Sequence, residues 1–152
     1  MRTVLFICTG NTCRSPMAEG IARRLVETGA VEGVDSGLFV ASAGVFAADG
    51  VPISPESADA LARRGIETDI RSTRLTPEMI RKADLVLGMT QSHVQAARMM
   101  VGEDDRTTIE RVDPDRDIED PIGMGQDAYD RVAARLDEVL PGRLHSLLAP
   151  SG

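Results

Sequence analysis

Aromatic residues are scarce in this sequence of 152 residues. They make up 3% of it, with no tryptophan and a single tyrosine, Tyr129. This shortage disfavours domains that bind nucleic acids by stacking bases on aromatic rings. Aliphatic residues and the seven methionines must fill the interior instead. Since a chain of this length buries roughly two thirds of its unfolded surface, it can form a core without disulfides or a metal. We expect one domain spanning residues 1–152.

Basic residues are also in short supply, because 17 of them face 24 acidic residues and leave a net charge of −7. A surface of that sign repels nucleic acids and anionic membranes at long range. The apolar run near the N-terminus ends at Cys8 and is far too short for a secretion signal or a membrane span. We therefore expect a cytoplasmic protein with no nucleic-acid or membrane partner.

Cysteine occurs only twice, as Cys8 and Cys13. Two cysteines this close together, in a chain without export features, do not indicate a structural disulfide scaffold. The two histidines, His93 and His145, are too distant to complete a recognisable zinc spacing. We interpret both as packing or surface residues and expect no metal or cofactor, whereas redox or nucleophilic chemistry at the cysteines stays open.

Predicted strands alternate with predicted helices along the chain. The apolar, β-branched segment Thr3–Ile7 is typical of a strand buried on both faces. A helix follows over Pro16–Glu27, with Ser15 as its expected N-cap. The further predicted elements are strand 38–45, helix 55–64, a short helix from 77, strand 84–89, helix 90–100, strand 107–112 and helix 126–140, which Pro141 interrupts or ends. This alternation predicts an α/β fold with a parallel sheet covered by helices on both faces and a ligand crevice at the carboxyl ends of the strands.

A polar loop, Cys8-Thr9-Gly10-Asn11-Thr12-Cys13-Arg14-Ser15, lies between the first strand and the first helix. Backbone N–H groups and the positive end of the helix converge there, which suits a phosphate. The loop matches neither GxxxxGK nor GxGxxG and reads as Cys-x5-Arg-Ser.

The residue types of this loop suit phosphoryl transfer. N–H donors favour the Cys8 thiolate, which is a nucleophile. Arg14 can hold two phosphate oxygens with its planar fork of donors. Ser15 can donate to the Cys8 sulfur and make it a better leaving group when water attacks a phosphocysteine. Alone, Cys8 would be read as a small buried apolar residue and Arg14 as a surface charge, but their combination favours the chemistry.

The reaction also needs an acid to protonate the leaving group. Asp113-Pro114 closely follows the last predicted strand, and Asp120-Pro121 lies deeper in the loop 113–125. Either aspartate can also be a simple turn residue. We prefer Asp120, and the residues alone leave Asp113 open.

The chain resembles the low-molecular-weight protein tyrosine phosphatase family over almost its whole length. The matching motifs are residues 4–19, Ser42-Ala43-Gly44, residues 83–89 and Asp120-Pro121. The resemblance implies a Rossmann-like, four-stranded parallel sheet of the phosphotyrosine protein phosphatase I type, a phosphorylated protein as substrate and no metal. It implies Cys8 as nucleophile, Arg14 as phosphate clamp and Asp120 as general acid. The same resemblance implies substrate binding by Thr9, Gly10, Asn11, Thr12, Cys13 and Ser15, a brace from Asn11 to Ser42, and a reversible Cys8–Cys13 disulfide.

Within that family, the loop looks like that of the bacterial protein-arginine phosphatases, in which the threonine at position 12 favours a phosphoguanidinium. Eukaryotic-type members carry an aliphatic residue there and aromatic residues after the Asp-Pro, whereas Ile122 follows Pro121 here. Tyr129 is interpreted as a packing residue of the last helix. Phosphoarginine is the expected substrate, with phosphotyrosine as the second.

Two other functions compete with this interpretation. An arsenate reductase on the same fold, of the thioredoxin-linked type, needs more cysteines downstream, and none follows Cys13. A non-catalytic phosphate-binding module has no need for Cys8, Arg14 and Asp120 together. The sequence makes no prediction of the oligomeric state.

Overall fold

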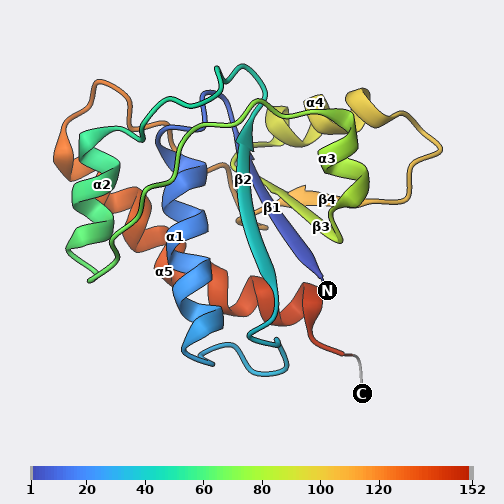
Figure 1. Ribbon diagram of the computed structural model, residues 1–152, viewed down its shortest axis with the longest axis horizontal. Coiled ribbons are helices and arrows are strands. Elements are labelled where there is room, and N and C mark those ends of the chain that lie inside the picture. The colour runs from blue at the N-terminus through green and yellow to red at the C-terminus, as the bar shows by residue number, and fades with distance from the viewer. Residues whose placement is uncertain (1, 151–152) are drawn as a thin grey trace.

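The computed structural model describes residues 2–150 and contains a four-stranded parallel sheet (Figure 1). The strands are β1 (Thr3–Cys8), β2 (Phe39–Gly44), β3 (Leu85–Gly88) and β4 (Thr108–Arg111), in the spatial order β2-β1-β3-β4. The predicted α/β class and parallel sheet are confirmed. Because β1 has a neighbour on each side, the segment that ends at Cys8 lies in the interior of the sheet.

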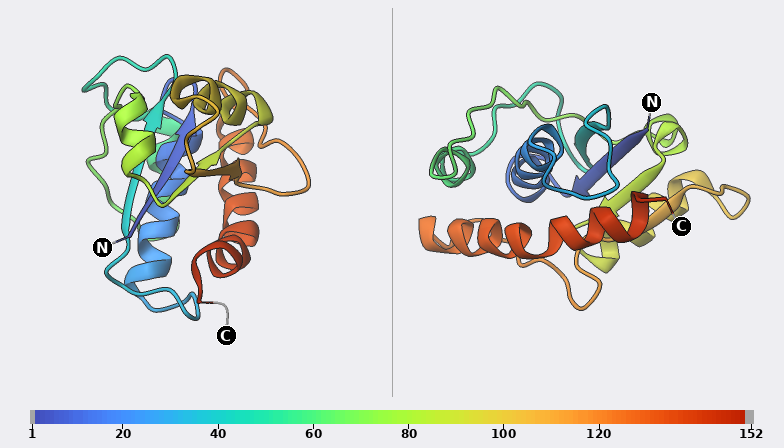
Figure 2. Two further views of the ribbon diagram at one scale, coloured as in Figure 1. Left: turned by 90° about the vertical axis from the view of Figure 1, so that its right-hand side faces the viewer. Right: turned by 90° about the horizontal axis from the view of Figure 1, so that it is seen from below.

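Helices cover both faces of the sheet (Figures 1 and 2). One face packs against α1 (Arg14–Glu27) and α5 (Gln126–Leu148), and α2 (Pro55–Ala62) packs against these two helices. The other face packs against α3 (Pro77–Lys82) and α4 (Gln91–Val101).

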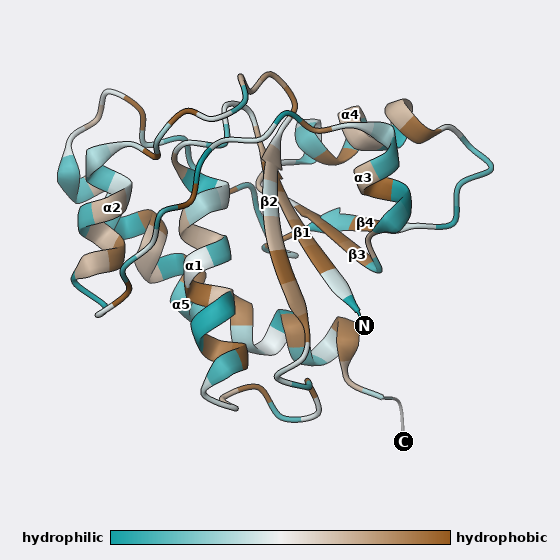
Figure 3. Ribbon diagram, viewed as in Figure 1, coloured by the Kyte–Doolittle hydropathy of each residue, from teal (hydrophilic) through white to brown (hydrophobic). Residues whose placement is uncertain are grey.

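Strand β1 shows why its residues are apolar without alternation. Val4 and Phe6 belong to the larger cluster of buried residues, on the side of α1 and α5, while Leu5 and Ile7 belong to the smaller one, on the side of α3 and α4. Successive side chains of a strand point to opposite faces, so a strand covered on both sides is apolar throughout. In Figure 3, β1 and β3 are coloured mainly brown, the colour of hydrophobic residues.

Two predicted helix starts are confirmed by side-chain caps. The backbone N–H of Ser57 donates to Ser54 Oγ over 3.2 Å at the start of α2, and that of Met79 donates to Thr76 Oγ1 over 3.2 Å at the start of α3. In each helix a proline occupies the first position, where its missing N–H costs nothing.

The predicted cap of α1 is wrong. The helix begins at Arg14, its N-cap is Cys13, and no side chain caps it. Ser15 therefore lies inside the first turn, and its hydroxyl is within 2.8 Å of Cys8 Sγ and 2.7 Å of Asn11 Nδ2. The serine serves the loop rather than the helix end, which the residue type alone does not reveal.

Helix α5 continues through Pro141 to Leu148, so the prediction that Pro141 interrupts or ends this helix is wrong. Proline removes one backbone hydrogen bond from a helix interior. Leu140, Leu144 and Leu148 are nevertheless all buried against the sheet. Burying this apolar stripe outweighs the lost bond.

Within residues 2–150, the structure contains no helix that combines the length and the apolar character needed to cross a membrane.

Candidate active site

The segment Cys8–Ser15, called the phosphate loop below, leaves the carboxyl end of β1 and enters α1. Its first residues are bound to the segment that follows β2. The N–H groups of Val45 and Phe46 donate to the carbonyls of Cys8 and Thr9 over 2.9 Å each. Gly44, at the end of β2, lies directly against the loop. A Cβ at Gly44 would stand 2.5 Å from the Thr9 carbonyl oxygen, so only glycine allows the loop to come this close.

Asn11 organises the phosphate loop from its centre. It is fully buried and adopts a left-handed backbone conformation, with φ of 57°, which asparagine tolerates better than most residues. Its Nδ2 donates to Ser15 Oγ over 2.7 Å and to Ser42 Oγ over 3.0 Å, while its Oδ1 accepts from the backbone N–H of Thr73 over 2.8 Å. The contact with Ser42 that the family resemblance implied is therefore present.

The bonds of Asn11 leave the Ser15 hydroxyl able to donate to Cys8. The hydroxyl groups of Ser15 and Ser42 can donate or accept, but the amide nitrogen of Asn11 can only donate. Ser15 Oγ receives a hydrogen from Asn11, so its own hydrogen is available to Cys8 Sγ, 2.8 Å away. The arrangement presents a donor to the sulfur, which favours a negatively charged thiolate.

Ser42 is itself held in place by the buried carboxylate of Glu19. Its hydroxyl accepts from Asn11 and donates to Glu19 Oε1 over 2.7 Å, and Glu19 forms an ion pair with Arg23 one helical turn further on. Burial raises the pKa of Glu19, while the bonds from Ser42 and Arg23 act in the opposite direction. The brace of the phosphate loop thus extends through α1 to an arginine at the surface.

Arg14 connects the phosphate loop to the loop 113–125. Its side chain is buried, and Nη1 donates to the carbonyl of Ile118 over 3.0 Å. Nη2 lies 3.8 Å from Asp120 Oδ2. The N–H of Ile118 in turn donates to the carbonyl of Met89, the residue directly after β3, over 2.8 Å. Backbone atoms of Ile118 therefore join the guanidinium to the sheet.

The two candidate acids occupy different surroundings. The Asp120 side chain is 51% exposed and stands beside Arg14. Asp113 is fully buried, and its carboxylate accepts from Arg135 Nε over 2.8 Å and from the N–H of Asp115 over 3.0 Å. Burial acts to raise the pKa of Asp113, but these bonds outweigh it and hold that pKa below its usual range. Asp113 is a structural partner of α5.

His93 contacts the phosphate loop. Its interpretation as a packing or surface residue did not predict this contact. Its Nε2 lies 2.9 Å from Thr9 Oγ1, and its Nδ1 accepts from the N–H of Thr90 over 3.2 Å. Burial and the positive charge of Arg14 lower the pKa of His93 to about 4, so the ring is neutral near pH 7. The pattern Thr90-x-x-His93 directly after a buried strand was the available signal. His145 is a surface residue, as interpreted.

Cys13 belongs to the phosphate loop, and its side chain is buried against α5. Its sulfur is 3.5 Å from the hydroxyl of Tyr129 and 3.7 Å from that of Ser54. Tyr129 is buried, as the sequence predicts, and this burial raises its pKa to about 12. Both Cys8 and Cys13 are free thiols in this structure.

Apolar side chains are exposed near the phosphate loop. Phe46, whose N–H is bound to Thr9, is 84% exposed, and Ile122, just beyond Asp120, is 63% exposed. Sequence reasoning identified Ile122 but missed Phe46, because only the folded chain brings residue 46 to residue 9.

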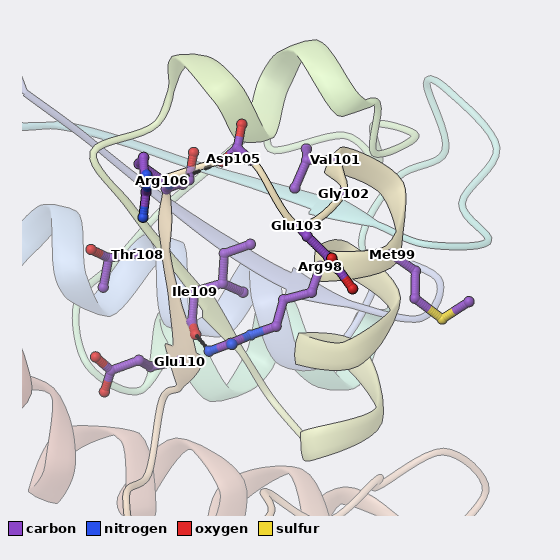
Figure 4. A pocket seen from close by; sticks show the side chains of 11 residues that line it. Arg98, Met99, Val101, Gly102, Glu103, Asp105, Arg106, Thr108, Ile109 and Glu110 are labelled. Atoms are coloured by element: carbon purple, nitrogen blue, oxygen red, sulfur yellow. Dashed lines mark hydrogen bonds between the residues drawn. The ribbon is translucent and has the colours of Figure 1, made fainter.

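A cavity of about 550 Å³ lies elsewhere, between the end of α4 and strand β4 (Figure 4). It is lined by residues 98–110 except Met100 and Asp104, and within it Arg98 Nη2 donates to the carbonyl of Ile109 over 2.7 Å. Predicted site residues do not line it. Across the described residues 2–150, no group of three or more His, Cys, Asp or Glu side chains is arranged to hold a metal ion.

An interior strand of the parallel sheet ends in a cysteine, and an arginine stands at the start of the helix that follows. Together with the family match, this arrangement defines the protein as a cysteine-based protein phosphatase, which is a hydrolase. Residues 3–149 match the family described as low molecular weight phosphotyrosine protein phosphatase. The chain belongs to this family.

Relatives and solved structures agree with this assignment. The chain is 37% identical to the protein-arginine-phosphatase of Bacillus subtilis (strain 168), over 90% of this chain and 91% of the relative. It is 32% identical to the low molecular weight protein-tyrosine-phosphatase PtpB of a Staphylococcus epidermidis strain, over 90% and 93%.

The fold is similar to that of two solved structures. One is the YwlE arginine phosphatase from Geobacillus stearothermophilus, with a TM-score of 0.81, 35% identity and coverage of 96% of this chain and 92% of that one. The other is the low molecular weight protein tyrosine phosphatase from T. tengcongensis, with a TM-score of 0.85, 36% identity and coverage of 97% and 100%.

Proposed function

We propose that this protein removes phosphoryl groups from protein side chains through a phosphocysteine on Cys8. The Cys8 thiolate attacks phosphorus, the bond to the leaving group breaks, and the backbone N–H groups of the phosphate loop and the Arg14 guanidinium hold the phosphoryl oxygens. Water then attacks the phosphocysteine, which releases inorganic phosphate and returns the thiolate.

The observation that carries this proposal is the position of the Ser15 hydroxyl, 2.8 Å from Cys8 Sγ, where Asn11 also donates to it. Because Asn11 donates to Ser15, the serine hydrogen is available to the sulfur in both half-reactions. It stabilises the thiolate before attack and again when the sulfur leaves phosphorus. A protein that only bound phosphate would gain nothing from a donor aimed at a sulfur.

We assign the general acid to Asp120. Its exposure lets it reach a leaving group above the phosphate loop, and its 3.8 Å distance from Arg14 puts it at the edge of the phosphate site. Asp113 is held as a carboxylate by Arg135 and is poorly suited to donate a proton.

The preferred substrate in this proposal is phosphoarginine, with phosphotyrosine as the second. Two features support it: Thr12 offers a hydroxyl to a polar leaving group, and Ile122 follows Pro121 where an aromatic wall would favour a phenyl ring. The names of the relatives above include both activities. We also place the reaction in the cytoplasm, where thiols are kept reduced. Arsenate reduction is not favoured, since no cysteine follows Cys13.

The test compares two serine substitutions. Cys8→Ser should lower kcat for p-nitrophenyl phosphate by at least about 10³-fold, because a hydroxyl is a far weaker nucleophile, while inorganic phosphate still binds. Cys13→Ser is the matched control: the Cys13 sulfur contacts Ser54 and Tyr129, so only the backbone of this residue takes part in binding, and kcat should stay within about tenfold of the parent. Turnover by Cys8→Ser near the parent rate would refute the covalent mechanism.

The substrate preference is measured separately, with phosphoarginine and phosphotyrosine versions of one peptide assayed side by side. We expect the higher kcat/KM for phosphoarginine. A higher kcat/KM for phosphotyrosine would reverse the preference without affecting the mechanism.

A further inference from the structure

His93 is buried at the start of α4 and contacts the residue that follows the nucleophile. Its Nε2 lies 2.9 Å from Thr9 Oγ1. The mechanism above assigns it no role. A buried histidine that faces a phosphate-binding loop needs a reason for its polarity, since an apolar side chain would fill the same space at lower cost.

The neighbouring backbone fixes which nitrogen of His93 carries the hydrogen. The N–H of Thr90 donates to Nδ1 over 3.2 Å, and a backbone amide can only donate. Nδ1 is therefore the acceptor, and in the neutral ring the hydrogen lies on Nε2. The bond to Thr9 then runs from Nε2–H to the hydroxyl oxygen, which leaves the hydroxyl hydrogen of Thr9 free to donate elsewhere.

The same helix start also holds the segment that leads to Asp120. The N–H of Gln91 donates to Asp117 Oδ1 over 2.9 Å, and the carbonyl of Met89 accepts from Ile118 over 2.8 Å. Residues 89–93 thus contact both the phosphate loop and the approach to the acid. A shift of His93 would change the spacing between the two halves of the site.

We propose that His93 is a positioning residue for phosphoryl transfer: its Nε2–H holds the Thr9 hydroxyl oxygen, so that this hydroxyl donates its hydrogen to a phosphoryl oxygen in the phosphate loop. The inference rests on the proposed function of that loop. A neutral ring suits this task, because it orients a donor without adding a second cation next to Arg14.

Asparagine and glutamine at position 93 separate this role from a purely structural one. In His93→Asn, the side-chain oxygen can still accept from Thr90 and keep the helix start, but the side chain is too short to reach Thr9. In His93→Gln, the amide nitrogen reaches further and can replace Nε2. We expect His93→Asn to lower kcat for p-nitrophenyl phosphate about tenfold, with a smaller change in KM, and His93→Gln to recover most of the loss.

Thr9→Val provides the partner for a double-mutant cycle. If His93 acts through Thr9, then Thr9→Val lowers kcat by a similar factor and His93→Asn costs nothing more in that background. Fully additive losses, or a His93→Asn variant with the kcat of the parent, would overturn the inference.

A further measurement does not depend on turnover. The ¹⁵N shifts of the His93 ring should report hydrogen on Nε2, and inorganic phosphate should bind more weakly to His93→Asn than to the parent protein. Hydrogen on Nδ1, or equal phosphate affinity, would overturn the role of His93. If the parent protein itself fails to hydrolyse p-nitrophenyl phosphate, the proposed function fails, and these two readouts still decide the inference.

Discussion

Among single residues, the two aspartates that precede a proline in the loop 113–125, Asp113 and Asp120, show most clearly how burial divides their roles. The carboxyl group beside Arg14 is half exposed, whereas the one bound to Arg135 has no contact with solvent. Both are followed by proline, so their sequence context does not separate them. Their surroundings do, because a proton donor has to reach the leaving group.

Matched asparagine substitutions test this division. Asp120→Asn should lower kcat for phenyl phosphate at least about tenfold more than for p-nitrophenyl phosphate, because only the poorer leaving group needs a proton in the transition state. Asp113→Asn should instead lower the free energy of unfolding by about 1–3 kcal/mol, since it weakens the buried bond to Arg135. Steady-state kinetics on both substrates and urea unfolding provide the data. A leaving-group dependence in Asp113→Asn would transfer the acid role to that residue.

Among the elements, the end of β2 matters most for the site, because Gly44 lies against the phosphate loop. Gly44→Ala would force the Thr9 carbonyl away from a contact of 2.5 Å. We expect it to cost about 1–3 kcal/mol of stability and to lower kcat about 100-fold, since small displacements of catalytic groups are expensive.

Gly142→Ala is the control for this substitution. Gly142 lies inside α5, and a Cβ there meets nothing within 4 Å. Alanine should therefore stabilise the helix by about 0.5–1 kcal/mol and leave kcat unchanged. Thermal unfolding and p-nitrophenyl phosphate assays on both variants give the comparison. Equal activity losses in the two variants would show that the fit at Gly44 is not the cause.

Most elements are predictable from the sequence, because their signals are local. Pro55 and Pro77 follow Ser54 and Thr76, and in both places a helix begins at the proline. The two errors have a common cause. Ser15 has the residue type of a helix cap and Pro141 that of a helix end, but tertiary contacts decide both, through Cys8 for the serine and through the buried leucines that follow for the proline.

The functional site is likewise predictable from the sequence only where its signals are local. The Cys-x5-Arg-Ser spacing identifies the phosphate loop, because all of its residues are consecutive in the sequence. The contact between His93 and Thr9 joins residues 84 positions apart, and that between Glu19 and Ser42 joins two elements. No local pattern encodes such pairs, so they emerge only when β1, β2 and β3 pair in register.

At the scale of the whole molecule, the neutral state of His93 links the site to folding. Burial and Arg14 lower its pKa from the usual 6.5 to about 4, although Asp117 and Asp120 act to raise it. The unfolded chain therefore binds this proton more readily than the folded protein between these pH values. The contribution of His93 to stability is complete above pH 6.5 and is lost as the pH falls towards 4.

This linkage predicts that the parent protein loses stability between pH 7 and pH 4.5 more steeply than His93→Asn, which has no imidazole to titrate. The difference should be on the order of 1–2 kcal/mol. Urea unfolding at several pH values measures it. Parallel stability curves for the two proteins would mean that the ring titrates equally in both states.

Ile118 has a consequence for how such a protein can diverge. Both of its anchoring bonds, to Arg14 and to Met89, use backbone atoms. They therefore do not depend on the side chains of the residues that follow Ile118. Mutations in residues 122–124, beyond the proposed acid Asp120, can accumulate and alter what flanks the reacting group without displacing the arginine that binds it. The preference for a substrate and the ability to cleave its phosphate bond can thus be inherited separately.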